Sequence, residues 1–274
     1  MKHTAPKTIL CIHDLSGMGR CSLSVATPVL AAMGHQPVML PTTLLSAHTG
    51  GLGKPVVQPL AAYGDAALDH YRKLGVEFDC IYSGYLASEA EQQLVHKAFS
   101  YWPGALKVVD PVLADHGRFY TGMQPLLPGM RQLCREADLI LPNLTEACFL
   151  LERDYSADEM TAEQAQELAD QLSENVQRAV VTGLPLAKHL ACAGSSGRDR
   201  FVVKRLRIDR SYPGTGDLFA AVLVGCLLRG NALSAAADAA AGFVAEAINN
   251  TAPTADPAFG VWFEPLLGRL CGGN

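Results

Sequence analysis

The amino-acid sequence predicts an α/β fold in which a central, mainly parallel sheet is covered by helices on both faces. Short apolar runs of strand length alternate with longer amphipathic stretches up to residue 183 of the 274-residue chain. Parallel strands need a crossover segment between them, so this alternation indicates repeated βαβ units. The sequence shows no linker, repeat or low-complexity segment, and we therefore expect a single domain over residues 1–274.

Six apolar runs have the length and composition of short buried strands. They span residues 7–13, 37–40, 78–84, 105–110, 137–143 and 178–183. Amphipathic stretches, such as residues 89–102 and 161–176, separate most of these runs and are typical of helices that cover a sheet.

The pattern changes after residue 183. The strand-like runs "AKHLACAG" and "RFVVKRLRI" flank the polar, flexible "SSGRD", which predicts a hairpin across the edge of the sheet. Three helices are then expected to complete the chain, over residues 216–229, 234–249 and about 258–269.

Composition limits the partners of the chain. Apolar residues make up 49% of the sequence and charged residues 18%, which is typical of a globular protein. The net charge of -5 provides no basic surface for nucleic acid or an acidic membrane, and no apolar run reaches membrane-spanning length. We therefore expect a cytoplasmic protein that handles small molecules. Its eight scattered cysteines lack zinc-site spacing and are expected as reduced thiols, mostly in the core.

Polar residues close the predicted strands at the edge where open parallel sheets bind their ligands. These residues are His13, Asp14, Ser83, Tyr85, Asp110, Asn143, Glu146 and Thr182. Several acids and amides, without a zinc-type cluster, favour a Mg²⁺-bound phosphate, because Mg²⁺ prefers hard oxygen ligands.

The stretch "SYPGTGDLFAAVLVG" adds a glycine turn to this edge. Gly214 and Gly216 allow positive φ and a close approach of the backbone, and the apolar run from Asp217 to Leu228 predicts a helix. The free N–H groups at a helix start suit an anion such as phosphate. Asp217 is then either an N-cap or a base that accepts a proton from an attacking group.

The other candidates also have structural interpretations. Asp110 can end a strand before proline, and Asn143 with Glu146 has the pattern of a capping box. Tyr85 fits a half-buried core position with a paired hydroxyl group. Solvation or hydrogen bonding is the expected role of three histidines in predicted loops. These are His13, His48 and His116. The occurrence of so many candidates at one sheet edge nevertheless favours a functional site.

Five motifs, in the same order along nearly the whole chain, resemble the pyridoxal kinases of the ribokinase superfamily. They are "SAHTGG" (46–51), "YSGYL" (82–86), "VVDPVLAD" (108–115), "LPNLTEA" (141–147) and "GTGDLFAA" (214–221). The last motif is shared across the superfamily, whereas "SGYL" and the His-Thr-Gly of "SAHTGG" are narrower and point to the vitamin B6 branch. Residues 12–34 are similar to bacterial proteins called pyridoxamine kinases.

This resemblance implies a ribokinase-like fold without a separate lid domain, usually assembled as a homodimer. It also implies an enzyme of vitamin B6 salvage, a phosphotransferase with an alcohol group as acceptor. The reaction would transfer the γ-phosphoryl group of ATP to the 5′-hydroxyl of pyridoxal, pyridoxine or pyridoxamine. The implied cofactors are ATP and Mg²⁺, with a monovalent cation such as K⁺ as a further option.

The resemblance also assigns roles to individual residues. Asp217 would be the base, and the N–H groups of Gly214, Thr215 and Gly216 would form the anion hole. Glu146 and Asp110 would help to organise Mg²⁺. The nucleotide would contact Asp110, Asn143, Thr182 and Thr215. The B6 ring would contact Asp14, Ser16, Leu45, Thr49, Tyr85 and, from a mobile loop, Tyr120.

Three departures from the family pattern affect the ring site most. The chain has Asp14-Leu15-Ser16 where typical pyridoxal kinases have Ser-His-Val. Leu45 replaces an aromatic residue, and Leu141 replaces a threonine before Asn143. We hypothesise that the Asp14 carboxylate pairs with a protonated pyridine nitrogen or with the amine of pyridoxamine.

Three other functions fit the sequence less well than this one. Hydroxymethylpyrimidine kinases of thiamin synthesis commonly have Cys after Gly-Thr-Gly, where this chain has Asp217. A B6-binding protein without catalysis would be expected to lose Asp217, Asn143 or Glu146, and all three are present. A dehydrogenase would need Gly-x-Gly-x-x-Gly after the first strand, where this chain offers Gly17 and Gly19 with the wrong spacing.

Overall fold

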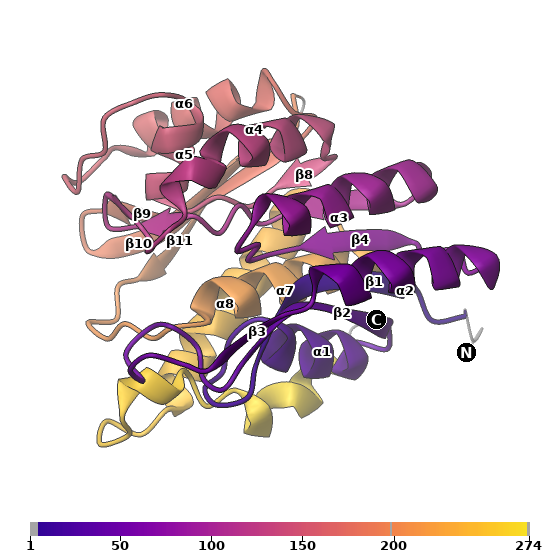
Figure 1. The fold of residues 1–274 in the computed structure, drawn as a ribbon. Helices are drawn as coiled ribbons and strands as arrows, with labels where there is room; N and C mark the ends of the chain where they lie inside the picture. Colours follow the sequence, from indigo (N-terminus) through magenta and orange to yellow (C-terminus); the bar gives the residue numbers. More distant parts are fainter. Residues whose placement is uncertain (1–4, 198, 273–274) are drawn as a thin grey trace.

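The structure of the chain, a computed structural model, describes residues 5–197 and 199–272 (Figure 1). A nine-stranded sheet with the strand order β11-β10-β9-β8-β5-β4-β1-β2-β3 forms its centre. The strands are β1 (Thr8–Ser16), β2 (Gln36–Leu45), β3 (Val57–Pro59), β4 (Cys80–Ser83), β5 (Leu106–Val109), β8 (Leu139–Ile140), β9 (Ala179–Leu186), β10 (His189–Ser195) and β11 (Arg200–Leu206). A separate ribbon pairs β6 (Ala114–Asp115) with β7 (Arg118–Phe119).

The strands from β9 through β8, β5, β4 and β1 to β2 are parallel to one another. At one edge β3 is antiparallel to β2, and at the other edge β10 and β11 form an antiparallel hairpin that continues from β9. The predictions of a mainly parallel sheet and of a hairpin after residue 183 are thus confirmed.

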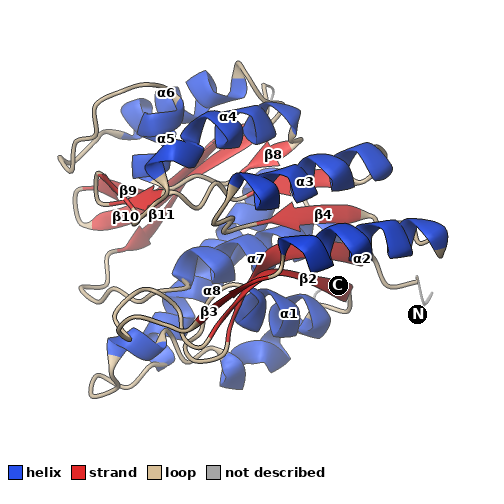
Figure 2. Cartoon of the chain, in the orientation of Figure 1, coloured by secondary structure: helices blue, strands red, loops and turns tan. Residues whose placement is uncertain are grey.

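Helices cover both faces of this sheet, as Figure 2 shows. The α-helices are α1 (Leu23–Ala32), α2 (Ala61–Lys73), α3 (Glu89–Tyr101), α4 (Leu127–Glu136), α5 (Leu144–Leu150), α6 (Ala162–Ser173), α7 (Thr215–Leu228) and α8 (Leu233–Asn250). The short 3₁₀ helices are η1 (Gln124–Leu126), η2 (Pro257–Phe259) and η3 (Glu264–Leu270). One core cluster lies between the sheet and α2 to α6, and the other lies between the sheet and α1, α7, α8 and η3.

Strand β1 shows how the sequence builds these two cores. Ile9 and Cys11 belong to the cluster on the α1, α7 and α8 side, whereas Leu10 and Ile12 belong to the opposite cluster. All four side chains are fully buried. Successive side chains of a strand point to opposite faces, so a strand covered on both faces needs an uninterrupted apolar run.

Two expectations from the sequence are wrong. His13 does not lie in a loop, because β1 continues past it to Ser16 and pairs with the end of β2 after a register shift between His13 and Leu15. Residues 258–269 do not form one helix but the separate 3₁₀ helices η2 and η3. Gly260 lies between them with φ +77°, which is outside the right-handed helical region.

The cysteines match their prediction, because all eight are free, and six of them are buried. Within residues 5–197 and 199–272, no helix combines the length and the hydrophobicity that crossing a bilayer requires.

Candidate active site

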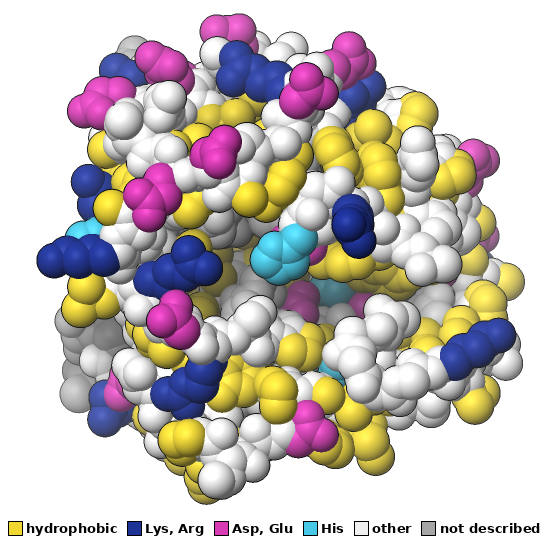
Figure 3. All heavy atoms as spheres, turned by 90° about the vertical axis from the view of Figure 1, so that its left-hand side faces the viewer, with side chains coloured by type: hydrophobic (Ala, Val, Ile, Leu, Met, Phe, Trp, Pro, Cys, Tyr) yellow, Lys and Arg dark blue, Asp and Glu magenta, His cyan; other side chains and the backbone are white. Residues whose placement is uncertain are grey.

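The candidate active site lies where the parallel strands end and α7 begins. His13 and Asp14 belong to the last part of β1, Asp110 directly follows β5, and Asp217 belongs to the first turn of α7. Figure 3 views the molecule from the end to which the parallel strands point and shows a hollow with acidic and histidine side chains inside it. The structure therefore brings together the sheet edge and the glycine turn, as the sequence predicted.

The glycine turn is fixed against the loop that follows β1. Gly214 has φ +78° and is the N-cap of α7. A Cβ at this position would lie 1.8 Å from the carbonyl oxygen of Arg20, so glycine is required both by the conformation and by the contact. A Cβ at Gly216, by contrast, would have no heavy atom within 4 Å other than its chain neighbours and the backbone of its own helix. The first N–H groups of α7 lack acceptors within the helix and are thus available to an anion at this open position.

Asp217 is not an N-cap, because Gly214 occupies that position. Its carboxylate is held instead by two partners from outside its helix. Asp217 Oδ1 lies 3.0 Å from His13 Nε2, and Oδ2 accepts a hydrogen bond of 2.8 Å from the Ser22 backbone N–H. A carboxylate has about four acceptor positions, so these two contacts leave others for a substrate hydroxyl group.

His13 joins Asp217 to Asp14 in the interior. The His13 side chain is 1% exposed, and its Nδ1 lies 2.9 Å from Asp14 Oδ1. Asp14 Oδ2 accepts a hydrogen bond of 3.0 Å from the Ser16 hydroxyl group. Burial alone would lower the pKa of His13, but the hydrogen bonds and charges of Asp14 and Asp217 outweigh burial and raise it to about 10.

Asp110 and Glu146 form a second pair of buried acids at this edge. Burial raises the pKa of Asp110 to about 8, with a further increase from the charge of Asp217 and an opposing decrease from His13. Burial and the charge of Asp110 raise the pKa of Glu146 well above its usual range, against the hydrogen bonds that it accepts. Two neighbouring carboxyl groups with raised pKa values would be stabilised in their charged forms by a cation.

Glu146 and Asn143 form the capping box predicted from their spacing. Asn143 Oδ1 accepts from the Glu146 N–H at 3.0 Å, and Glu146 Oε2 accepts from the Asn143 N–H at 2.9 Å. The other Glu146 oxygen accepts from the Leu113 N–H at 3.0 Å, and Asn143 Nδ2 donates to the Ala114 carbonyl at 2.8 Å. The capping box therefore also holds the segment that leads into β6. Thr182 joins it through a backbone hydrogen bond to Pro142 and a bridge to Asn143.

The donor set fits a magnesium ion that is bound mainly through phosphate and water. Among the described residues, no three His, Cys, Asp or Glu side chains are grouped as a metal site. Mg²⁺ usually keeps several waters and takes one or two carboxylates in addition to substrate phosphates. Asp110 is a carboxylate of this kind, whereas both Glu146 oxygens accept backbone N–H groups, so that Glu146 would act through water.

The predicted ring contacts occupy the ends of β1, β2 and β4. Ser16 is buried and pairs in register with Leu45, and the backbone N–H of the half-buried Tyr85 points at His13 Nδ1 from 3.2 Å. Thr49 is exposed in the loop after β2. Its neighbour Gly50 places that loop beside the glycine turn, because a Cβ at Gly50 would lie 3.7 Å from Pro213 Cβ.

Tyr120 follows the β6–β7 ribbon and is 41% exposed. Burial raises the pKa of its hydroxyl group, and the charges of Glu146, Asp115, Asp110 and Asp217 raise it further. Tyr120 is therefore within electrostatic reach of the acids at the sheet edge. The other two histidines of the predicted loops have the roles expected from the sequence, which were hydrogen bonding or solvation. They are His48 and His116. His48 contacts the Ala258 carbonyl at 2.6 Å, and the His116 side chain is 83% exposed.

Sequence reasoning missed the role of His13 and of the residues that hold it. A Cβ at Gly84 would lie 2.0 Å from His13 Nε2, so the glycine of "YSGYL" gives the imidazole its place. The available signal was that the predicted strand over residues 7–13 already contains His13, which places this histidine on a strand rather than in a loop.

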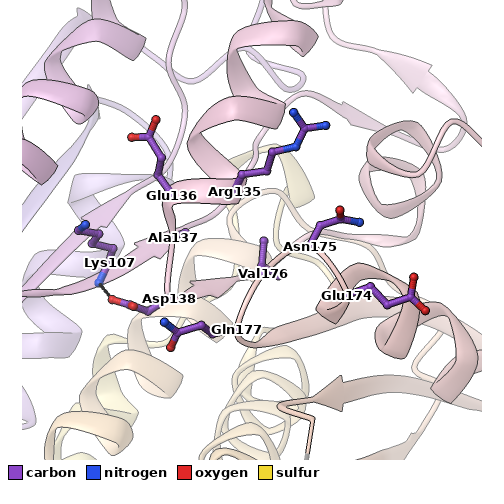
Figure 4. A pocket seen from close by; sticks show the side chains of 9 residues that line it. All are labelled: Lys107, Arg135, Glu136, Ala137, Asp138, Glu174, Asn175, Val176 and Gln177. Carbon is purple, nitrogen blue, oxygen red and sulfur yellow. Dashed lines mark hydrogen bonds between the residues drawn. The ribbon is translucent and has the colours of Figure 1, made fainter.

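Another hollow lies at the opposite edge of the sheet, where the parallel strands begin. It has a volume of about 470 Å³ and is lined by Lys107, Arg135, Glu136, Ala137, Asp138, Glu174, Asn175, Val176 and Gln177 (Figure 4). Lys107 lies near the start of β5 and Asp138 directly before β8, and the Lys107 backbone N–H donates to Asp138 Oδ2 at 2.8 Å. The sticks in Figure 4 show Glu136, Arg135 and Glu174 extending apart from one another rather than converging on one point. This hollow therefore lacks the convergent groups of the candidate active site.

Comparisons with known proteins identify the family of the chain. The sequence profile of the phosphomethylpyrimidine kinase family matches residues 66–261. The pyridoxine/pyridoxal/pyridoxamine kinase of Bordetella avium is 28% identical over 274 residues, which cover 88% of this chain and 87% of the relative.

Two solved structures resemble the chain over nearly its whole length. The pyridoxal kinase of Lactobacillus plantarum is 34% identical, with a TM-score of 0.87 and coverage of 96% of both chains. A Bacteroides thetaiotaomicron protein, provisionally named a phosphomethylpyrimidine kinase and crystallised with pyridoxal, is 36% identical. Its TM-score is 0.90, and the match covers 97% of this chain and 96% of that one. The chain therefore belongs to the pyridoxal kinases within the phosphomethylpyrimidine kinase family, and it has their ribokinase-like fold.

Proposed function

We propose that the chain transfers the γ-phosphoryl group of ATP to the 5′-hydroxyl of pyridoxal, pyridoxine or pyridoxamine. The observation that carries the proposal is the position of Asp217, which is held by His13 and Ser22 in the first turn of α7, directly after the Gly214 turn. The pyridoxal in the crystal of the Bacteroides relative and the name of the Bordetella kinase support a B6 vitamer as the acceptor.

Asp217 acts as the base in this proposal. The vitamer hydroxyl group donates a hydrogen bond to an acceptor position of Asp217 that His13 and Ser22 leave free. As the hydroxyl oxygen attacks the γ-phosphorus, its proton moves to the Asp217 carboxylate. The oxygen is thereby activated at the moment when its bond to phosphorus forms. The bond between the γ-phosphorus and the β,γ-bridging oxygen breaks, and ADP leaves.

The glycine turn stabilises the transferring phosphoryl group. The backbone N–H groups of Gly214, Thr215 and Gly216 would donate to its oxygens at the positive end of the α7 dipole. Phosphoryl transfer needs mainly alignment and neutralisation of charge, and a fixed turn supplies both without rearrangement. The contact between Gly214 and Arg20 provides the rigidity of this turn.

Mg²⁺ would neutralise the phosphate charges of ATP when bound. We propose that Asp110 and Glu146 help to hold it, through water, and that Asn143, Thr182 and Thr215 contact the nucleotide. The raised pKa values of Asp110 and Glu146 support a cation beside them. A monovalent cation such as K⁺ at Asp110 is part of the same proposal.

The B6 ring would lie over the ends of β1, β2 and β4. In this proposal Ser16, Leu45, Thr49 and Tyr85 surround the ring, and Tyr120 covers it and limits the access of water to ATP. Asp14 belongs to the same region, but its two oxygens contact His13 and Ser16. We therefore propose that Asp14 affects the ring site through these two neighbours.

We further propose that the chain works in the cytoplasm as a homodimer of single-domain subunits, without nucleic-acid or membrane partners. Exposed apolar side chains at the β3 edge support a self-association surface. They are Met39, Leu44, Val56, Val57 and Tyr63. Charged residues usually protect such an edge strand in a monomer.

An ATP-dependent assay with pyridoxal, pyridoxine, pyridoxamine and hydroxymethylpyrimidine tests the proposal. We expect turnover of at least one B6 vitamer, and a loss of about 10²- to 10⁴-fold in kcat for Asp217→Asn. Turnover of hydroxymethylpyrimidine alone would identify a thiamin-pathway kinase. Binding of vitamers without turnover would identify a B6-binding protein, and full activity of Asp217→Asn would refute the assigned base.

A further inference from the structure

We infer that His13 is a positioning residue. Through a buried chain of hydrogen bonds from Asp14, it keeps the Asp217 carboxylate ionised and in the orientation needed for the reaction. The three residues Asp14, His13 and Asp217 are called the triad below. This inference rests on the proposed kinase function, because it assigns a role within the same reaction. It adds a residue that the sequence motifs alone did not single out.

The triad is shielded from solvent along its whole length. The side chains of His13, Asp14 and Asp217 are 1%, 4% and 12% exposed. The distances are 2.9 Å between Asp14 Oδ1 and His13 Nδ1, and 3.0 Å between His13 Nε2 and Asp217 Oδ1. Asp14 is anchored in turn by the Ser16 hydroxyl group at 3.0 Å. Asp217 is thus the outermost member of a rigid chain that begins inside the sheet.

The number of protons in the triad follows from these distances. An imidazole nitrogen and a carboxylate oxygen at about 3 Å need a hydrogen between them. The backbone N–H groups of Asp14 and Tyr85 also point at His13 Nδ1, from 3.0 and 3.2 Å. The proton between His13 and Asp14 therefore belongs either to Nδ1 or to the Asp14 carboxyl group. The raised pKa of His13 places a hydrogen on Nε2, which donates it to the Asp217 carboxylate.

His13 offsets the negative charge that gathers around Asp217. The groups that face His13 are Asp14 on β1, Asp217 on α7, Asp110 after β5 and the Tyr82 ring on β4. Tyr82 is edge-on at 6.2 Å between ring centroids and brings no charge. Without His13, the Asp217 carboxylate would face other acids in a buried region. Like charges in a buried region repel one another, and a carboxyl group that takes up a proton to relieve this repulsion cannot act as a base.

The chain is built to accommodate this histidine. Gly84 leaves the space that the imidazole fills, because a Cβ there would lie 2.0 Å from Nε2. The register shift between His13 and Leu15 changes the pairing of β1 with β2 at this point. Burying three titratable side chains costs stability relative to an apolar cluster, which favours a role in the reaction over a role in folding.

The test uses His13→Gln, whose amide N–H can still donate toward Asp217 but carries no charge. We expect the acid limb of the pH profile of kcat/KM to move upward by about 1–3 pH units, with partial recovery of kcat at alkaline pH and little change in KM. The matched control is His35→Gln, because His35 contacts the Gly225 carbonyl at 2.9 Å far from the triad. An unmoved acid limb in a folded His13→Gln enzyme would overturn the inference.

A second measurement does not depend on turnover. In ¹⁵N-histidine NMR spectra of the wild-type protein, we expect the His13 ring to remain protonated at Nε2 and not to titrate between about pH 6 and 8. Asp14→Asn should move its titration to lower pH, because one partner carboxylate is lost. Ordinary titration of His13 in the wild type would refute the triad. If the triad is seen by NMR but no vitamer is phosphorylated, the proposed function fails while the hydrogen-bonded chain stands.

Discussion

The carbonyl oxygen of Arg20 occupies the place that a side chain at Gly214 would need, 1.8 Å from an ideal Cβ. The Ser22 N–H, two residues after Arg20, binds Asp217 Oδ2. One loop after β1 therefore fixes both the anion-binding turn and the base. Because the neighbour of Gly214 is backbone rather than a flexible side chain, the contact cannot be relieved by a rotamer change.

We expect Gly214→Ala to lower the free energy of unfolding by at least about 1–2 kcal/mol from the positive φ alone, with a further loss from the backbone clash. Chemical denaturation of both proteins measures this difference. The matched variant is Gly216→Ala, where a Cβ would have no heavy atom within 4 Å other than its chain neighbours and the backbone of its own helix. Equal stability of Gly214→Ala and Gly216→Ala would contradict the proposed packing of the turn.

The fold was predictable from the sequence because the central strands are covered on both faces. Such strands need apolar residues at every position, and Ile9, Leu10, Cys11 and Ile12 gave β1 a clear signal. The prediction ended too early where β1 becomes polar at His13, because polar residues at that strand end belong to the site. The segment 258–269 was predicted as one helix, but the φ +77° of Gly260 divides it.

The components of the site were predictable, but not all of their contacts. The order of strands and the glycine turn placed Asp110, Asn143 and Asp217 at one edge. The hydrogen-bonded contact between His13 and Asp217, however, joins residues 204 positions apart. Periodicity and capping patterns describe neighbours along the chain, so they carry no information about such a contact.

The buried acids predict a pH dependence of stability. The pKa of Asp110 is raised to about 8 in the folded protein, from 3.8 in the absence of burial. The folded state therefore binds more protons than the unfolded state between these values, and stability should fall as pH rises through this window. Each excess proton bound by the folded state contributes a slope of about 1.4 kcal/mol per pH unit.

Urea denaturation of the ligand-free protein at several pH values between about 5 and 8 measures this slope. We expect Asp110→Asn to make the slope shallower and to raise stability at pH 8, because no buried carboxylate is then ionised at this position. Asp209→Asn is the control, because the Asp209 side chain is 95% exposed. If Asp110→Asn and Asp209→Asn have the same slope, Asp110 does not carry the raised pKa.

The departure at Asp14 leads to the last prediction. The sequence suggested that this carboxylate selects a protonated ring or the amine of pyridoxamine. In the structure the Asp14 side chain is 4% exposed and contacts His13 and Ser16, so its effect should reach the substrate through Asp217. We expect Asp14→Ser to lower kcat for pyridoxal, pyridoxine and pyridoxamine by a similar factor. Steady-state assays with each vitamer measure this, and a loss confined to pyridoxamine would instead support a direct contact with its amine.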